Sequence, residues 1–184
     1  YIPKFNDIFK DKKKSKIKLL KKDKILCAKY RKGHFEGVLD VMNKLTKIIN
    51  PQKIFMGEKD FQQLYLVKKQ LERSYKTKVI PCKTIRDRNN VALSSRNLLL
   101  NKSSIAIAAK IYKKLVSIKK DINNKKKISN FLNIKKKELK NNYKIKIDYL
   151  ELRNINNLKI SSTKQNSRLF IAYYLNNIRL IDNL

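Results

Sequence analysis

The segment KIFMGEKDFQQL, residues 53–64, carries the pattern from which the fold of the first half of the chain can be predicted. Residues 54–56 form a short apolar run that ends at Gly57, as expected for a buried strand. From Asp60 to Tyr75 the apolar residues recur at helical spacing, and Asp60 is a suitable N-cap. The segment therefore predicts a strand that turns directly into a helix.

The residues on both sides extend this pattern. A second strand is expected over residues 78–85, so that strand, helix and strand follow closely and form a β–α–β unit with parallel strands. Upstream, helical periodicity over residues 35–49 ends at Asn50-Pro51. Residues 1–24 are expected to be irregular, and residues 24–30 to form a short strand or a turn of helix.

The second half of the chain has a different pattern, with several short strands close together. Helices are expected at residues 103–119 and 126–142, and strands at residues 145–152, 169–175 and 178–181. This order favours a small α+β domain with a largely antiparallel sheet. The boundary is placed near Ile85, which gives domains of residues 1–85 and 86–184.

The composition limits the class of protein. Hydrophobic residues make up 42% of the 184 residues, so a buried core is possible. No apolar run approaches the roughly 20 residues of a membrane span, and no signal peptide is visible at the start. Cys27 and Cys82 have no CxxC spacing, which favours free, buried thiols in a reducing compartment. Because the chain begins with Tyr1 rather than methionine, we expect a fragment or a processed product.

The formal net charge of +32 would normally suggest nucleic acid or an anionic membrane as a partner. The lysines, however, are spread along the whole chain together with many Asn, Ile and Tyr residues, as an AT-rich genome produces. Lysine runs such as Lys12–Lys14 and Lys135–Lys137 are interpreted as solvated surface or loops. A nucleic-acid or membrane partner is therefore not expected.

The turn between the first strand and its helix is the strongest candidate site. Gly57 allows close approach of the backbone to a ligand, and Lys59 adds a positive charge beside a helix N-terminus, which favours phosphate. Asp60 can cap the helix or accept bonds from ribose hydroxyls, and Gln63 lies one turn further on the same side. A capped helix start with a solvated lysine would give the same spacing.

A second candidate is the polar segment Ser94-Ser95-Arg96. Two hydroxyl groups and a guanidinium in a loop suit a polyphosphate, because they offer fixed donors and a bidentate fork. A polar turn before a helix is the alternative interpretation.

A third candidate is the turn from Arg31 to His34, which precedes the expected helix at Phe35. His34 is the only histidine of the chain and could donate to an anionic substrate there. A structural hydrogen bond is the alternative role for a single histidine.

Read in order, these segments resemble the pantothenate synthetase family. The resemblance is specific in RKGHFEGV (31–38), INPQKIFMGEKDFQQL (49–64) and VALSSRNLLL (91–100), and weaker in IDYLELRN (147–154) and FIAYYLNNIRLIDN (170–183). The matching family patterns are RPGHFxGV, PDxxxFGEKDxQQL, DGLALSSRN and ARLIDN.

The resemblance implies an α/β fold, with a Rossmann-like nucleotidyltransferase-type parallel sheet, here partial, and a smaller C-terminal α+β lid domain. It implies a ligase that forms a C–N bond between pantoate and β-alanine, with Mg²⁺ and ATP, through a pantoyl adenylate that releases pyrophosphate and then AMP. It further implies a cytoplasmic homodimer in pantothenate biosynthesis.

The family's functional residues can be carried over by motif. Catalytic roles are implied for Lys59, Ser94, Ser95 and Arg96. Contacts with ATP are implied for Gly57, Glu58, Lys59, Asp60, Ile85, Leu93, Ser94, Ser95 and Arg96, with Ile85 meeting adenine through its backbone. Contacts with pantoate are implied for Gln63, His34 and Arg31, and no protein residue is implied as a metal ligand.

The chain also departs from the family pattern. Lys32 replaces the usual proline, Met56 the usual phenylalanine, and Asn89-Asn90 the usual Asp-Gly, although Asn still tolerates a turn. The family's N-terminal PTMGxLHxGH segment has no counterpart here. We therefore expect that these 184 residues alone do not adenylate pantoate.

Two other functions remain open from the sequence. A different adenylate-forming ligase or nucleotidyltransferase on the same core would activate another carboxylate. A non-catalytic basic fragment that binds nucleic acid would show binding that weakens steeply with salt and does not respond to ATP.

Overall fold

The computed structural model describes residues 2–9, 17–122 and 127–184. The run Lys12–Lys14 and the expected helix start at Lys126 lie outside these ranges. The chain divides into two compact units, Tyr1–Lys83 (unit 1) and Thr84–Leu184 (unit 2), each of which is described by itself. In the described part of the chain, no helix is long and apolar enough to cross a membrane.

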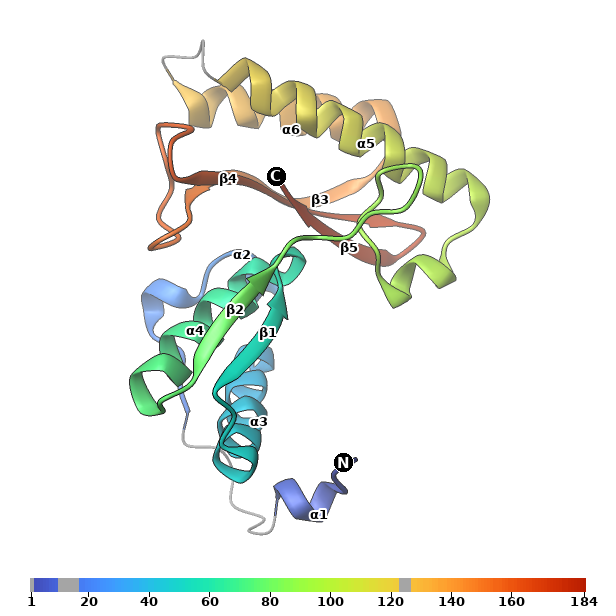
Figure 1. Cartoon of the computed structure of the whole chain (residues 1–184). Helices are drawn as coiled ribbons and strands as arrows, with labels where there is room; N and C mark the ends of the chain where they lie inside the picture. The colour runs from blue at the N-terminus through green and yellow to red at the C-terminus, as the bar shows by residue number, and fades with distance from the viewer. Residues whose placement is uncertain (1, 10–16, 123–126) are drawn as a thin grey trace. The chain divides into compact units, whose positions relative to one another are not determined.

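Unit 1 is built around a β–α–β unit, as the sequence predicts. Strands β1 (Lys53–Gly57) and β2 (Lys78–Cys82) pair in parallel, and helix α4 (Phe61–Ser74) connects them. Its apolar face packs against both strands and against α3 (His34–Ile49), as traced in Figure 1. The crossover places the turn between β1 and α4 at the carboxyl end of the sheet.

The remaining elements of unit 1 are short. They are α1 (Phe5–Ile8), the 3₁₀ turns η1 (Lys21–Asp23) and η2 (Glu58–Asp60), and α2 (Leu26–Tyr30). The expectation of irregular structure over residues 1–24 was thus wrong at α1 and η1. Of the two forms expected for residues 24–30, the structure has the helical one, α2. Cys27 in this helix is buried as expected, but Cys82 at the end of β2 is exposed, so the prediction of a buried thiol was wrong there.

Two details of the strand–helix segment differ from the sequence prediction. β1 was expected to be buried, but Phe55 is 67% exposed. Successive residues of a strand point to opposite faces of the sheet, and Phe55 lies on the face opposite Ile54 and its buried partner Val79. Asp60 occupies the N-cap position of α4, but its side chain makes no capping hydrogen bond, because the preceding residues already turn as a 3₁₀ helix.

Unit 2 is an antiparallel sheet covered by two helices. The strands β3 (Lys146–Asn154), β4 (Ser167–Leu175) and β5 (Ile178–Asn183) lie in the order β3-β4-β5. Helices α5 (Lys102–Asp121) and α6 (Ile128–Tyr143) lie on the same side of this sheet in Figure 1. The helices and strands share one apolar core, so the α+β prediction for this half is confirmed.

The hairpin between β4 and β5 follows from its two turn residues. Asn176 and Asn177 both have positive φ, at 47° and 65°, which a two-residue turn between twisted strands requires and which asparagine tolerates. The hairpin fixes β5 beside β4 and brings the last residues of the chain, including Asp182 and Asn183, to the central strand.

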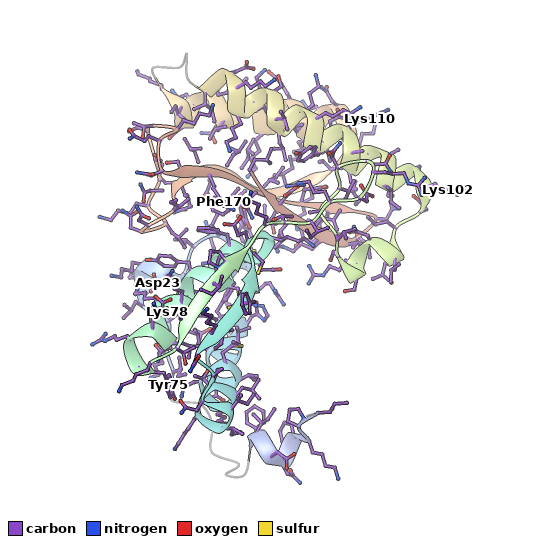
Figure 2. The ribbon with its side chains drawn as sticks, viewed as in Figure 1. Asp23, Tyr75, Lys78, Lys102, Lys110 and Phe170 are labelled. Atoms are coloured by element: carbon purple, nitrogen blue, oxygen red, sulfur yellow. The ribbon has the colours of Figure 1, made fainter. Side chains whose placement is uncertain are left out.

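The lysines are distributed over the surfaces of both units. Lys102 and Lys110 lie along α5 and Lys78 lies at the start of β2, all of them exposed (Figure 2). Several lysines lie over aromatic rings of their own unit, such as Lys146 over Tyr174 at 5.2 Å. This distribution agrees with the interpretation of the charge as a property of the whole surface.

Candidate active site

The turn after β1 carries four of the residues that the sequence predicts at the nucleotide. Gly57 closes β1 opposite Cys82, and an added Cβ there would meet nothing within 4 Å, so the space beside its Cα is open. Glu58 and Lys59 are half-buried in the 3₁₀ turn η2, and Asp60 is exposed at the start of α4. The turn thus presents one amine and two carboxylates at the carboxyl end of the sheet.

The two neighbouring glutamines of α4 lie in different environments. Gln63 is half-exposed in the first turn of the helix. Gln62 is only 5% exposed, and its side-chain amide bonds the backbone of Asp23, Ile25 and Ala28. The sequence prediction did not include Gln62. A polar side chain among the buried positions of the helix was the available signal, but its partners are 34 to 39 residues away in sequence.

The turn that carries Arg31 and His34 is fixed by its backbone. Gly33 is the N-cap of α3 with φ of 76°, a conformation that favours glycine. The amide of His34 donates to the carbonyl of Arg31 at 3.2 Å, and the His34 ring lies 5.0 Å from the ring of Phe35. Both Arg31 and His34 are half-buried.

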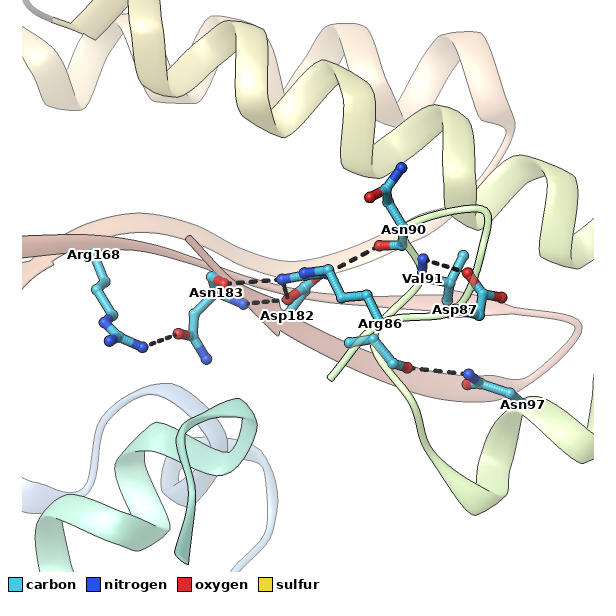
Figure 3. A network of polar contacts seen from close by, with 9 residues as sticks. Arg86, Asp87, Asn90, Val91, Asn97, Arg168, Asp182 and Asn183 are labelled. Carbon is cyan, nitrogen blue, oxygen red and sulfur yellow. Dashed lines mark hydrogen bonds and ion pairs between the residues drawn. The ribbon is translucent and has the colours of Figure 1, made fainter. Parts of the chain in front are cut away.

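In unit 2, the chain turns back on itself in a narrow hairpin between Ile85 and Leu93 (Figure 3). Arg86 and Ala92 form an antiparallel bridge, and the amide of Leu93 donates to the carbonyl of Ile85 at 2.9 Å. At the tip, one carboxylate oxygen of Asp87 accepts from the amides of Asn89 and Val91. Ile85 and Leu93, both predicted at the nucleotide, are therefore adjacent and exposed.

The Ser94-Ser95-Arg96 segment begins the 3₁₀ helix η3 (Ser95–Leu99). The Ser94 hydroxyl accepts from the amide of Arg96 at 3.3 Å, and Ser95 is exposed. One terminal nitrogen of the Arg96 guanidinium donates to the carbonyl of Arg179 on β5 at 2.8 Å. A guanidinium has five N–H donors, so this bond leaves capacity for an anion.

An ion pair between Arg86 and Asp182 joins this hairpin to β5. The guanidinium binds the carboxylate at two positions, with N···O distances of 2.7 and 2.8 Å, and the side chains are only 17% and 9% exposed. The same guanidinium donates to the carbonyl of Asn90 at 3.1 Å and lies 4.3 Å from the ring centroid of Tyr112. Burial lowers the pKa of Arg86, but the hydrogen bonds and charge of Asp182 outweigh it and leave this pKa raised.

Sequence reasoning did not select Arg86 and Asp182 as site residues. They are separated by 96 positions, so no local spacing indicates that they meet. Asn183 beside them receives a further bond from Arg168 of β4 at 2.9 Å, which ties the end of the chain to the central strand.

Comparisons with known proteins show the family of the chain. The family model described as pantoate-beta-alanine ligase matches residues 1–184. The chain belongs to the pantoate–β-alanine ligase family.

Relatives of this ligase family match over most of the chain. A curated pantothenate synthetase from Flavobacterium psychrophilum is 36% identical over 162 residues, which are 85% of this chain and 56% of the relative. A crystal structure of pantothenate synthetase from Thermus thermophilus matches with a TM-score of 0.87 at 25% identity, covering 99% of this chain and 67% of that protein.

A third match is a pantoate–β-alanine ligase from Francisella tularensis, complexed with beta-gamma ATP and beta-alanine. It has a TM-score of 0.73 and 32% identity, and the match covers 97% of this chain and 61% of that one. This chain thus spans between 56% and 67% of the lengths of these three ligases.

The buried Arg86–Asp182 pair predicts a large stability effect. Asp182→Asn leaves the Arg86 charge without a balancing carboxylate, and we expect a loss of about 3–5 kcal/mol in the free energy of unfolding. Urea-induced unfolding measures it. Glu138→Gln, in the more exposed pair with Lys135, is the control, with an expected loss of at most about 1 kcal/mol. Equal losses would show that the Arg86–Asp182 pair is not a structural anchor.

The raised pKa of Tyr173 in β4 leads us to expect a loss of stability at high pH. Burial, and then the charge of Asp182, raise the pKa of Tyr173 more than Arg86 lowers it. Above the unfolded-state pKa of about 10, the unfolded tyrosine loses a proton that the folded one keeps, so stability falls as pH rises.

The free energy of unfolding of Tyr173→Phe, measured below and above that pH, is expected to fall less steeply with pH than that of the parent. Tyr30→Phe, at an exposed position, is the control for removal of a tyrosine. Identical pH dependence of the parent and Tyr173→Phe would contradict the assignment.

Proposed function

We propose that the protein containing this chain is a pantoate–β-alanine ligase. A carboxylate oxygen of pantoate attacks the α-phosphorus of ATP, and the bond to the β-phosphate breaks, which gives pantoyl adenylate and pyrophosphate. The amine of β-alanine then attacks the acyl carbon, releasing AMP and a proton. The match of residues 1–184 to the family model carries the proposal. The relative complexed with beta-gamma ATP and beta-alanine supports the choice of substrates.

In this proposal the turn after β1 binds the nucleotide. Gly57, Glu58 and Asp60 contact the ribose side, where the open space beside Gly57 allows close approach. Lys59 contacts the phosphates from the start of α4, where the helix dipole also favours negative charge. The amine stabilises charge that develops as the phosphorus is attacked, which is why we assign it a catalytic role.

Pantoate is assigned to Gln63, Arg31 and His34. All three are half-buried polar residues of unit 1, and Gln63 lies in the same first turn of α4 that follows Lys59. The positive charge of Arg31 suits the pantoate carboxylate, while an amide and an imidazole suit its hydroxyl groups.

The hairpin of unit 2 is assigned to the phosphates and the adenine. Ser94, Ser95 and Arg96 supply hydroxyl and guanidinium donors for the polyphosphate. Ile85 and Leu93, both exposed apolar residues, are assigned to the base, with Ile85 meeting adenine through its backbone. Unit 1 then belongs to the ATP- and pantoate-binding domain and unit 2 is the lid domain. Positioning and charge stabilisation account for catalysis, with no covalent intermediate on the protein.

The finer parts of the proposal concern Mg²⁺, assembly and location. Mg²⁺ is proposed to reach the site with ATP, because this ion is commonly held by substrate phosphates with one or two carboxylates. Among the described residues no group of three or more His, Cys, Asp or Glu side chains could hold a metal. Glu58 and Asp60 are the two carboxylates of the turn after β1, to which the nucleotide is assigned. A homodimer in the cytoplasm is proposed from the family resemblance.

Lys59→Ala tests the assignment of the phosphate contact. With the intact open reading frame, we expect AMP release that requires both pantoate and β-alanine and that falls roughly 10²-fold or more in the variant. Lys53→Ala removes a lysine at the opposite end of β1 and is the matched control. AMP release that is equally low in both variants would contradict the role of Lys59.

A companion measurement concerns the 184 residues alone. The three ligases described above are longer than the segment matched here, so we expect no pantoate-dependent AMP release from this chain by itself. Turnover by the isolated 184 residues would overturn that expectation without affecting the proposed reaction.

A further inference from the structure

Gln62 has both ends of its side-chain amide engaged in the interior of unit 1. Its amide nitrogen donates to the carbonyls of Asp23 at 3.1 Å and Ile25 at 2.8 Å, and its amide oxygen accepts from the backbone of Ala28 at 3.2 Å. Two carbonyl partners and one N–H partner also fix which end of the amide is nitrogen. One side chain of α4 thus holds the segment from Asp23 to Ala28.

The held segment has other signs of a fixed conformation. Leu26 has a φ of 46°, a strained value for a bulky residue, and its side chain is only 3% exposed. The carboxylate of Asp23, itself buried, pairs with Lys69 of α4 at 3.3 Å. A strained backbone persists only where its surroundings hold it, and here two side chains of α4, Gln62 and Lys69, bond the segment.

The segment continues directly into the turn of Arg31 and His34. It runs through α2, after which the amide of Arg31 donates to the carbonyl of Cys27 at 2.9 Å, and the amide of His34 donates to Arg31. A continuous series of hydrogen-bonded turns therefore runs from the residues that Gln62 holds to this turn. The next residue of α4 after Gln62 is Gln63.

We propose that Gln62 is a positioning residue for the pantoate pocket. It ties the turn with Arg31 and His34 to the first turn of α4 and so sets their distance from Gln63. The proposal rests on the proposed function, because it assumes that these three residues bind pantoate. Gln62 touches no substrate in this account. The two adjacent glutamines therefore have separate roles: Gln62 holds the turn with Arg31 and His34, and Gln63 binds pantoate.

The proposal requires an effect that loss of stability alone does not produce. A shift of about 1 Å in one side of a pocket can lower the rate roughly 10²-fold when several groups must contact the same substrate. Loss of the Gln62 bonds should therefore lower kcat/KM for pantoate in particular. The nucleotide turn, Gly57–Asp60, lies outside the segment that Gln62 holds, so the KM for ATP should change little.

Gln62→Met and Gln62→Glu test the proposal in the intact open reading frame. Methionine keeps the length and removes all three bonds, while glutamate keeps an acceptor and loses both donors. We expect both to lower kcat/KM for pantoate by about 10- to 100-fold, with the KM for ATP within about twofold of the parent. The matched control is Thr77→Val: Thr77 is 3% exposed and ties to the carbonyl of Pro51 at 2.6 Å, at the amino ends of the strands.

Amide hydrogen exchange gives a second readout that does not need activity. In Gln62→Met we expect faster exchange over residues 26–34, including the Ala28 and His34 amides, with α5 and β4 unchanged. Gln62 is not a positioning residue if its variants impair both substrates alike, as in Thr77→Val, so that kcat/KM for pantoate falls and the KM for ATP rises. It is also not a positioning residue if hydrogen exchange over residues 31–34 is unchanged. A parent without pantoate-dependent AMP release would instead refute the proposed function, and exchange would still decide whether Gln62 holds the turn.

Discussion

The parallel pairing of β1 with β2 is the constraint on which unit 1 depends. Parallel strands cannot be joined by a tight turn, so α4 must cross over between them, and its first turn must follow the carboxyl end of β1. That geometry brings a lysine, two carboxylates and two glutamines within seven residues of sequence to one edge of the sheet. Ligand sites of open α/β sheets lie at this edge, because strand ends and helix N-termini meet there.

The two units hold their candidate loops by different means. In unit 1 a neutral amide, Gln62, satisfies three backbone groups of the segment that leads to Arg31 and His34. In unit 2 a buried charged pair, Arg86 with Asp182, closes the base of the hairpin that leads to Ser94. Neither interaction uses a side chain that the sequence predicts at a ligand.

Much of this organisation could be predicted from sequence, because periodicity and local motifs report local structure. The β–α–β unit, the helix before it, and the strands and helices of unit 2 all follow from hydrophobic spacing. The exposure of Phe55 could not be predicted in the same way, because it depends on which face of the β1–β2 sheet is covered. The roles of Gln62 and Asp182 were not predicted, because their partners are distant in sequence and because both residues satisfy buried polar or charged groups.

Pantoate-dependent exchange of labelled pyrophosphate into ATP, measured with no β-alanine present, tests the central claim most directly. The account predicts exchange in the intact open reading frame that requires pantoate and does not require β-alanine, because the first half-reaction is reversible at the adenylate. Exchange that proceeds without pantoate, or that appears only when β-alanine is added, would contradict a pantoyl-adenylate ligase and the roles assigned to Lys59, Gln63 and Arg96.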